Sequence, residues 1–463
     1  MSFSWALSSI SANDELFRQF WWFYPFGFLF IGIASGLVFA LPFWMTALYK
    51  KWNTSSSVTP AMTGPGLHPS SLPIAFALAW TFTLWLREWL FTGFPWNPIA
   101  NIWINFPVGQ LMSVIGALGL TFITIGAIAA TAEFIHSRGK AKWPMLFLVP
   151  FLLPAIGFYH GRFDCRAGDG IIVRIVQPAF DMNMKINNPA MAQRIVEKLV
   201  YMSTKSTREY VEKFDDWDIM YKNRERPLDE INLIVWPETA FPWAINSSVL
   251  MPALGVPLVF GATYLYGRAY NAMALTDRDG RIVDVFKKFH LVPFGEFSPF
   301  NILPTPANLS RGPGPKLMNN NFVPSICYDI IFSDSIVPRG TRPDFILNIT
   351  NDGWFGPSKG PAQHMDMARR QAIETGLPIV RANYVGTTRR ASSAVIAKDG
   401  GFAAHPGEAF SIRRGKWIRN SVVFDAEIPG SCMTIYRRIG LNGIMLMIIL
   451  FSAPFMLLRR RKK

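Results

Sequence analysis

Glu238, Lys288 and Cys327 each come at or just after the end of an apolar run of strand-forming residues. A thiol becomes a nucleophile when a base takes its proton and a cation stabilises the negative charge that develops. A carboxylate and an ammonium group are the right types for those two tasks. Because the ends of several strands can converge in a β-rich sandwich, these residues are our candidates for base, cation and nucleophile.

Each of these residues also has an ordinary structural explanation. Cys327 could be a small buried hydrophobe, Glu238 a helix cap, and Lys288 part of a solvated strand edge. His290 fits a hydrogen-bonded structural role better than a catalytic one. The six histidines are scattered and form no HExxH motif, and no paired CxxC pattern occurs, so we expect no metal or other cofactor.

Between residues 161 and 434, short β-rich runs alternate with polar turns, which predicts an α/β domain. The runs are 171–176, 231–236, 256–263, 271–276, 281–286, 321–326 and 345–349. Asp-Arg-Asp-Gly at 277–280 predicts a hairpin, and a second one is expected around 398–400. Residues 189–226 and 361–376 have the pattern of helices.

Long apolar runs fill the rest of the chain. Half of the 463 residues are hydrophobic and 17% are charged, against about 25% charged in soluble proteins. The runs are 20–48, 73–91, 106–132, 143–159 and 439–458. Each is near the ~20 residues that cross a bilayer, and the first is one tilted helix or a tight helical pair. We therefore expect a multi-pass membrane protein with an N-terminal transmembrane region at 1–160, the α/β domain at 161–434 and a last helix with a basic tail at 435–463.

The placement of Lys and Arg predicts the orientation in the membrane. Basic clusters at 50–51, 138–142 and 459–463 fall on one side if the spans alternate. By the positive-inside rule that side is cytoplasmic, and the α/β domain lies outside; Arg437 and Arg438 lie on the opposite side and weaken the pattern. Because the basic residues flank the spans, we attribute the formal charge of +15 to contact with membrane lipids, and we expect no nucleic-acid partner.

Cys165 and Cys432 lie at the two ends of the outer domain. An outer compartment permits disulfides. The sequence does not show whether their Cα atoms come as close as disulfide-bonded cysteines do, which is usually about 4.4–6.8 Å. We expect two free thiols, with the disulfide as the alternative.

Four motifs in this order resemble the nitrilase, or carbon-nitrogen hydrolase, superfamily. They are Trp-Pro-Glu-Thr-Ala at 236–240, Lys-Phe-His-Leu-Val-Pro-Phe-Gly-Glu at 288–296, Ile-Cys-Tyr-Asp at 326–329 and Thr-Asn-Asp-Gly-Trp-Phe-Gly at 350–356. More narrowly, they resemble the apolipoprotein N-acyltransferases, inner-membrane enzymes of bacterial lipoprotein maturation. Residues 86–89, 92–97 and 363–369, with Glu374 and Arg381, match that family's pattern as well.

The resemblance implies a periplasmic αββα sandwich in which Glu238 is the general base, Lys288 the electrophilic stabiliser and Cys327 the nucleophile. Glu296 matches a further acidic residue of the family's site, and Tyr328 the aromatic residue beside the cysteine; by themselves these two could cap a turn and pack. The implied reaction moves a phospholipid acyl chain, through a cysteine thioester, to the N-terminal amine of a diacylglyceryl-cysteine lipoprotein.

Two features depart from the family's pattern. Asp329 stands where the family usually has Glu, and the membrane region before Gly93 is shorter than the usual set of spans. These departures leave two alternatives: a conjugal-transfer protein with a nitrilase-like domain, and a membrane-tethered C–N hydrolase in which water resolves the acyl-enzyme.

Overall fold

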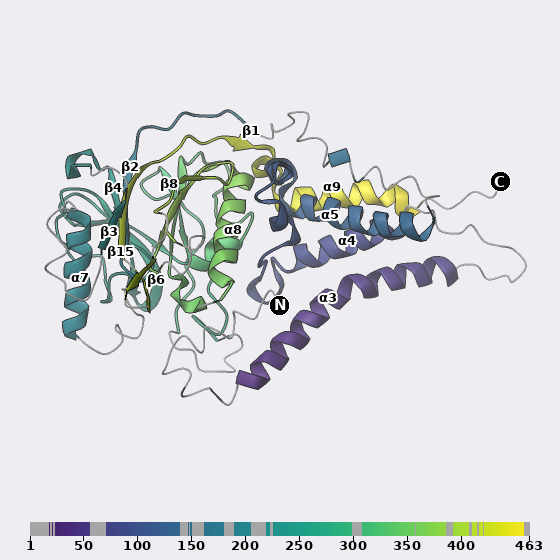
Figure 1. The fold of residues 1–463 in the computed structure, drawn as a ribbon, viewed down its shortest axis with the longest axis horizontal. Coiled ribbons are helices and arrows are strands. Elements are labelled where there is room, and N and C mark those ends of the chain that lie inside the picture. Colours follow the sequence, from purple (N-terminus) through teal and green to yellow (C-terminus); the bar gives the residue numbers. More distant parts are fainter. Residues whose placement is uncertain are drawn as a thin grey trace, which may run out of the picture. The chain divides into compact units, whose positions relative to one another are not determined.

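The computed structural model is shown in Figure 1, whose labels are used from here on. It describes residues 24–55, 71–138, 149–150, 162–179, 189–204, 219–222, 226–298, 308–356, 358–385, 392–406, 410–413, 416–419 and 421–457, with the single residues 18, 21 and 147. The chain divides into two compact units. Among the described residues, the sheet unit consists mainly of Cys165–Ala372 and Gly376–Cys432, and the helical unit of Pro25–Asp164, Ile373–Thr375 and the chain from Met433.

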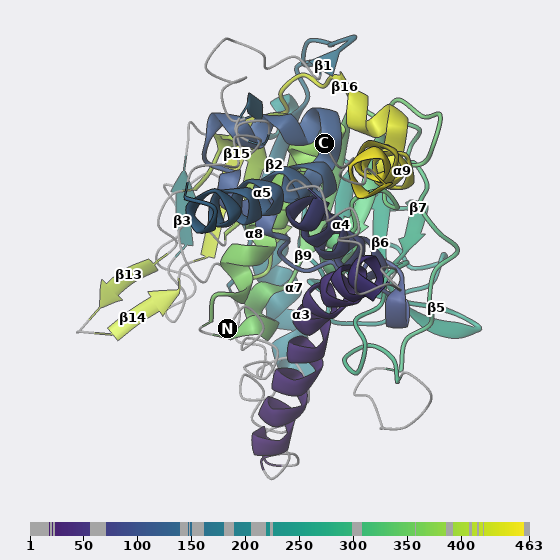
Figure 2. The ribbon, with the colours of Figure 1, turned by 90° about the vertical axis from the view of Figure 1, so that its right-hand side faces the viewer.

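The larger sheet of the sheet unit has seven strands in the order β3-β15-β2-β4-β5-β6-β7. Their bounds are β2 Ile172–Gln177, β3 Ile219–Lys222, β4 Leu233–Val235, β5 Leu258–Tyr266, β6 Arg268–Thr276, β7 Ile282–Lys287 and β15 Ser421–Glu427. Figure 2 shows the edge strands β3 and β7 at opposite sides of this sheet.

The second sheet has five strands in the order β12-β11-β10-β9-β8. Their bounds are β8 Phe322–Ile326, β9 Phe345–Thr350, β10 Ile379–Asn383, β11 Ala394–Ile396 and β12 Phe402–Ala404. Two short pairs complete the described strands: β1 Arg162–Phe163 with β16 Met433–Thr434, and β13 Phe410–Arg413 with β14 Lys416–Arg419.

The two sheets lie between two helices, so the sheet unit has the four αββα layers that the resemblance implies. Figure 1 shows α7 (Pro189–Thr204) outside the larger sheet and α8 (Gly360–Thr375) on the opposite side, beyond β8. Strand residues alternate between two cores: Phe424 packs between the sheets, whereas its neighbour Val423 packs in the core that contains α7. Both faces of the larger sheet are therefore buried, which explains its nearly continuous apolar strands.

Most of the predicted elements are present. The runs named above contain strands β2 and β4 to β9, and both predicted hairpins form, as β6–β7 and β11–β12. Helix α8 occupies the segment predicted at 361–376. The helix predicted over 189–226 is present at Pro189–Thr204 and wrong at Ile219–Lys222, which pairs with β15 as strand β3; residues 205–218 and 223–225 lie outside the described part.

The helical unit contains α3 Tyr24–Ser55, α4 Ser71–Leu86, α5 Met112–His136 and α9 Ile435–Leu457. Three helical segments among the described residues are long and apolar enough to cross a membrane: Gly32–Trp52, Pro107–His136 and Ile435–Met456. Helix α4 is apolar but has 16 residues. The first apolar run forms one helix rather than a pair, with Pro42 inside it. The predicted run at 143–159 lies almost wholly outside the described residues.

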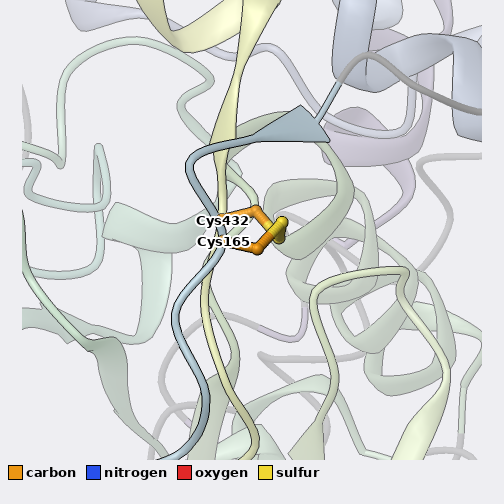
Figure 3. Close-up of a disulfide and its surroundings, with 2 residues drawn as sticks. All are labelled: Cys165 and Cys432. Carbon is orange, nitrogen blue, oxygen red and sulfur yellow. A yellow bond between two sulfur atoms is a disulfide. The ribbon is translucent and has the colours of Figure 1, made fainter.

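Cys165 and Cys432 form a disulfide that links the first and last parts of the sheet unit. Figure 3 shows the two chain segments running side by side at this point. The expectation of free thiols was wrong, because these residues are 267 positions apart in sequence but their Cα atoms are only 4.0 Å apart. Backbone pairing supports the approach, since the Arg166 N–H donates to the Ser431 carbonyl.

Candidate active site

The ends of three strands bring Glu238, Lys288 and Cys327 into one region of the sheet unit. Glu238 follows β4 after two residues, Lys288 directly follows β7, and Cys327 directly follows β8. Strands β4 and β7 belong to the larger sheet and β8 to the smaller one. The three strand ends thus lie in one region of the sheet unit, as the sequence predicted.

Lys288 is the centre of a buried group that we call the Lys288 cluster, with Glu238, Glu296 and Asn271. Lys288 Nζ lies 3.4 Å from Glu238 Oε1 and 2.9 Å from the Glu296 carboxylate. Asn271 Nδ2 donates to Oε1 of both glutamates at 2.8 Å. Burial alone would lower the pKa of Lys288, but Glu296 and Glu238 outweigh it and raise that pKa. The two carboxylates thus share one permanent cation and one neutral donor.

Contacts to both the side chain and the backbone of Glu238 hold this residue in place. Its Oε2 accepts the Asn351 N–H at 2.8 Å. The next residue, Thr239, has a left-handed φ of 49°. Gly261 on β5 packs against this turn, and a Cβ placed there would lie 2.6 Å from Glu238 Cα. Only glycine allows β5 to approach this turn so closely.

Cys327 is buried and forms no disulfide. Burial raises the pKa of the Cys327 thiol, Glu238 adds to the rise, and Lys288 opposes it. Glu238 and Lys288 thus both act electrostatically on the thiol. A base must therefore remove the thiol proton as the sulfur attacks, and the nearby carboxylate suits this step.

A second buried group, the Asp352 cluster, contains Asp352, His364, Arg381, Asn383 and Thr350. Asp352 lies 2.8 Å from Arg381 Nη2 and 2.8 Å from His364 Nδ1. It also accepts from Asn383 Nδ2 and from the Thr350 hydroxyl, both at 3.0 Å. Burial alone would raise the pKa of Asp352, but Arg381 and His364 hold it below its ordinary value. The cluster reaches Cys327 through His364 Nε2, which lies 3.1 Å from the Cys327 carbonyl oxygen.

The supporting residues named from the sequence also lie here. Glu296 contacts Lys288 and also caps its own turn, since Oε2 accepts the Val292 N–H. Tyr328 is buried and packs edge-on against Phe332.

Asp329 joins the cysteine turn to the segment after β7. It accepts the Ile326 N–H at 3.1 Å and the His290 N–H at 2.8 Å. The shorter side chain of Asp329 therefore makes both contacts directly. His290 also contacts Ser335 and stacks on Phe332, which fits the structural role expected for it.

Asn271 and Asn383 were not singled out from the sequence, and Thr350 and Asn351 were named only within the motif at 350–356. Asn271 is the clearest case, because it is 4% exposed and bridges both carboxylates. Its signal was a polar residue inside the apolar strand at 271–276. The Thr350 hydroxyl donates to Asp352 Oδ1 at 3.0 Å, and its interaction with the Cys327 thiol lowers the pKa of that thiol.

The described residues contain no group of three or more His, Cys, Asp or Glu side chains that could hold a metal ion. What they do offer is a buried thiol, a carboxylate that can take its proton and an ammonium that can stabilise an oxyanion. This combination supports acyl transfer through a covalent intermediate.

Two family models match parts of the chain. Residues 212–410 match the carbon-nitrogen hydrolase family, and residues 1–130 match the N-terminal domain of apolipoprotein N-acyltransferase. Among solved structures, an amidase of the nitrilase superfamily from Nesterenkonia AN1 matches with a TM-score of 0.35 and 14% identity, over 56% of this chain and 92% of that one.

Curated relatives match over most of the chain. An apolipoprotein N-acyltransferase of Rhodopseudomonas palustris is 30% identical over 91% of this chain and 82% of its own length. One of Bradyrhizobium diazoefficiens is 29% identical over 84% of this chain and 73% of its own. The nitrilase-like site, the N-terminal match and these relatives agree: the chain belongs to the apolipoprotein N-acyltransferase family.

Proposed function

We propose that this chain transfers an acyl chain from a phospholipid to the N-terminal amine of a diacylglyceryl-cysteine lipoprotein, through a thioester on Cys327. The Lys288 cluster carries the proposal. It places a carboxylate and an ammonium 3.4 Å apart, beside a buried thiol whose pKa both influence. Glu238, Lys288 and Cys327 are the proposed triad.

In the first half-reaction, Glu238 accepts the Cys327 thiol proton while the sulfur attacks the acyl ester carbon. Lys288 stabilises the oxyanion, together with a backbone N–H group. The ester C–O bond then breaks, Glu238 returns the proton to the leaving oxygen, and a lysophospholipid departs. The acyl chain remains as a thioester.

In the second half-reaction, the lipoprotein's amine attacks the thioester carbon while Glu238 takes a proton from the nitrogen. The C–S bond breaks, an amide forms and the proton returns to sulfur. Lys288 stabilises the second oxyanion as it did the first. Asn271 and Glu296 hold Lys288 and Glu238 in place, and Asp329 ties the nucleophile's turn to the segment that carries Lys288.

We place the chain in the bacterial inner membrane as a multi-pass protein with the domain 161–434 in the periplasm, between membrane regions 1–160 and 435–463. Both substrates are lipids, and the burial of each CH₂ group in the bilayer stabilises them there by about 0.8 kcal/mol. A reporter that works only outside the cytoplasm should be active when fused after Ser248 and silent when fused after Lys463. The reverse pattern would contradict this topology.

The relatives and the N-terminal match favour this function over a conjugal-transfer role. A membrane-tethered hydrolase would use the same thioester but release it to water. Product analysis separates the two, because an amide on the lipopeptide amine appears only in acyl transfer.

The test is labelling of purified, full-length protein with an alkyne-tagged phospholipid. Wild-type protein should form a label that neutral hydroxylamine and a lipopeptide amine both release. Cys327→Ala should give no label, and Glu238→Gln should slow labelling by about 10²–10⁴-fold. Label that persists in Cys327→Ala would contradict the mechanism, and label released only by water would favour hydrolysis.

A further inference from the structure

The nucleophile Cys327 has an unusual backbone conformation. Its φ is 47°, in the left-handed region that non-glycine residues rarely adopt. Asp329 fixes the chain just before it by accepting the Ile326 N–H. On the other side, His364 Nε2 lies 3.1 Å from the Cys327 carbonyl oxygen. Side chains from both sides thus hold the turn.

The His364 ring is itself firmly held. It is fully buried, and its Nδ1 lies 2.8 Å from Asp352 Oδ1 and 3.1 Å from Arg381 Nη2. A carbonyl oxygen can only accept, so Nε2 carries the hydrogen of its bond to Cys327. Nδ1 lies against a carboxylate oxygen, which also only accepts, so donation to Asp352 at Nδ1 and to Cys327 at Nε2 places a hydrogen on each ring nitrogen. Burial and Arg381 lower the pKa of His364, and Asp352 opposes that lowering.

The Cys327 carbonyl and the Tyr328 N–H belong to the same peptide group. In a planar trans peptide these two groups point in opposite directions. A bond that holds the carbonyl on the His364 side therefore directs the N–H to the opposite side. That N–H follows the nucleophile directly and is the backbone donor best placed to bind an oxyanion formed on the thioester carbon.

We propose that His364 is a positioning residue whose hydrogen bond to the Cys327 carbonyl aims the Tyr328 N–H at the oxyanion. This inference rests on the proposed function, because it requires acyl chemistry at Cys327. Both half-reactions pass through an oxyanion, so both depend on the same peptide orientation. Loss of the bond should slow both to a similar extent and leave the KM for the phospholipid unchanged.

Two amide substitutions separate this role from general support of the fold. In His364→Gln, the amide nitrogen can occupy the place of Nε2 and donate to the Cys327 carbonyl. In His364→Asn, the shorter amide can occupy the place of Nδ1 and contact Asp352, but it does not reach Cys327. Both variants keep a polar group in the Asp352 cluster, so they are matched controls for each other.

Two rates are measured on each purified full-length variant. One is acyl transfer from an alkyne-tagged phospholipid to a lipopeptide amine. The other is alkylation of Cys327 by iodoacetamide, which forms no oxyanion. His364→Asn should slow acyl transfer by about 10²-fold, as loss of an oxyanion donor does, and leave alkylation close to the wild-type rate. His364→Gln should retain most of the acyl transfer.

Equal loss in both variants, or equal slowing of transfer and alkylation in His364→Asn, would overturn the proposal. Glu238→Gln is the contrasting variant, because it should slow both reactions of the thiol. Wild-type protein that forms no acyl-enzyme would instead refute the proposed function. If His364→Asn unfolds on heating at a much lower temperature than His364→Gln, His364→Ser takes its place. The two rates are then measured on His364→Ser and His364→Gln at a temperature where both are folded.

Discussion

The Lys288 cluster and the Asp352 cluster both contact or influence Cys327, yet their charges are balanced differently. In the Lys288 cluster two carboxylates share one ammonium. In the Asp352 cluster one carboxylate meets one guanidinium and an imidazole, and two further side chains donate to it. The Lys288 cluster therefore has more carboxylates than cations, whereas in the Asp352 cluster both oxygens of the single carboxylate are matched by donors.

This difference in charge balance suits the two clusters to two tasks in covalent catalysis, proton transfer and the fixing of geometry. A group with surplus carboxylate can take up a proton during the reaction. A matched and fully buried group has no such freedom and holds its neighbours in one geometry. Substitutions in the Lys288 cluster should therefore reduce activity more than stability, and those at the ion pair of the Asp352 cluster should do the reverse.

Lys288→Met should have the largest effect on activity. It removes the cation that serves the oxyanion, and a single such stabiliser contributes about 10²–10³-fold in rate. It also leaves two carboxylates without their cation, so we expect losses beyond that range. Acyl-enzyme formation with tagged phospholipid is the measurement.

The neighbouring Lys287 provides a matched control. Its ammonium lies over the rings of Tyr266 and Tyr270, 4.4 Å from each centroid, and not in the cluster. Lys287→Met should keep near-normal activity. If both lysine variants lose activity equally, the special position of Lys288 is disproved.

Arg381→Met should have the largest effect on stability. Arg381 and Asp352 are fully buried and 2.8 Å apart, and removal of one partner of such a pair costs about 3–5 kcal/mol. Denaturant unfolding measures the loss. Arg281→Met is the control, because its ion pair with Asp279 is mostly exposed and should contribute little. An Arg381→Met protein as stable as wild type would remove the contrast between the clusters.

Asn271 tests how the two carboxylates of the Lys288 cluster are kept together. Asn271→Asp replaces the donor by a third carboxylate, 2.8 Å from each of the others, and should slow acyl transfer by about tenfold to a hundredfold, or 1–3 kcal/mol. Asn271→Ser keeps one donor and should lose less. If the aspartate variant is the more active of the two, Asn271 does not act as the donor described here.

Lys198 provides a contrast with Lys288, through the pH dependence of stability and not through activity. Its Nζ donates to the Ser421 hydroxyl and the Pro178 carbonyl, and burial lowers the pKa of Lys198 to about 7. The unfolded chain keeps this proton up to about pH 10.5, so between pH 7 and 10 it binds more protons than the folded chain. Stability should therefore rise with pH in this window, by at most about 1.4 kcal/mol per pH unit.

The measurement is the unfolding free energy of wild type minus that of Lys198→Met, followed from pH 6 to 10. The difference isolates Lys198 from other titrating groups. A difference that stays flat across the window would mean that Lys198 remains charged in the folded protein.

Much of the site could be predicted from the sequence because its residues follow apolar strands. Glu238, Lys288 and Cys327 each interrupt a run whose burial is evident from composition alone. Helix α8 was equally clear. The proposed roles of these residues remain predictions until the variants are made.

The other parts depend on contacts between distant segments. Asn271 lies within a strand, and only the pairing of β6 with β7 and the return of Glu296 show what it bridges. The strand β3 was read as helix because its place is set by pairing with β15, about 200 residues later in the chain. The disulfide was missed for the same reason, since nothing local brings Cys165 to Cys432.

That disulfide also changes how the sheet unit bears mechanical load. The chain enters the larger sheet through β2 and leaves through β15, and these strands are antiparallel neighbours with Ile172 opposite Glu427. Tension on the two outgoing ends would pull the two strands apart from one end and break the hydrogen bonds of this pair one at a time. Because Cys165 and Cys432 are joined outside the pair, such tension passes through a covalent bond instead, and the pairing of β2 with β15 is left unloaded.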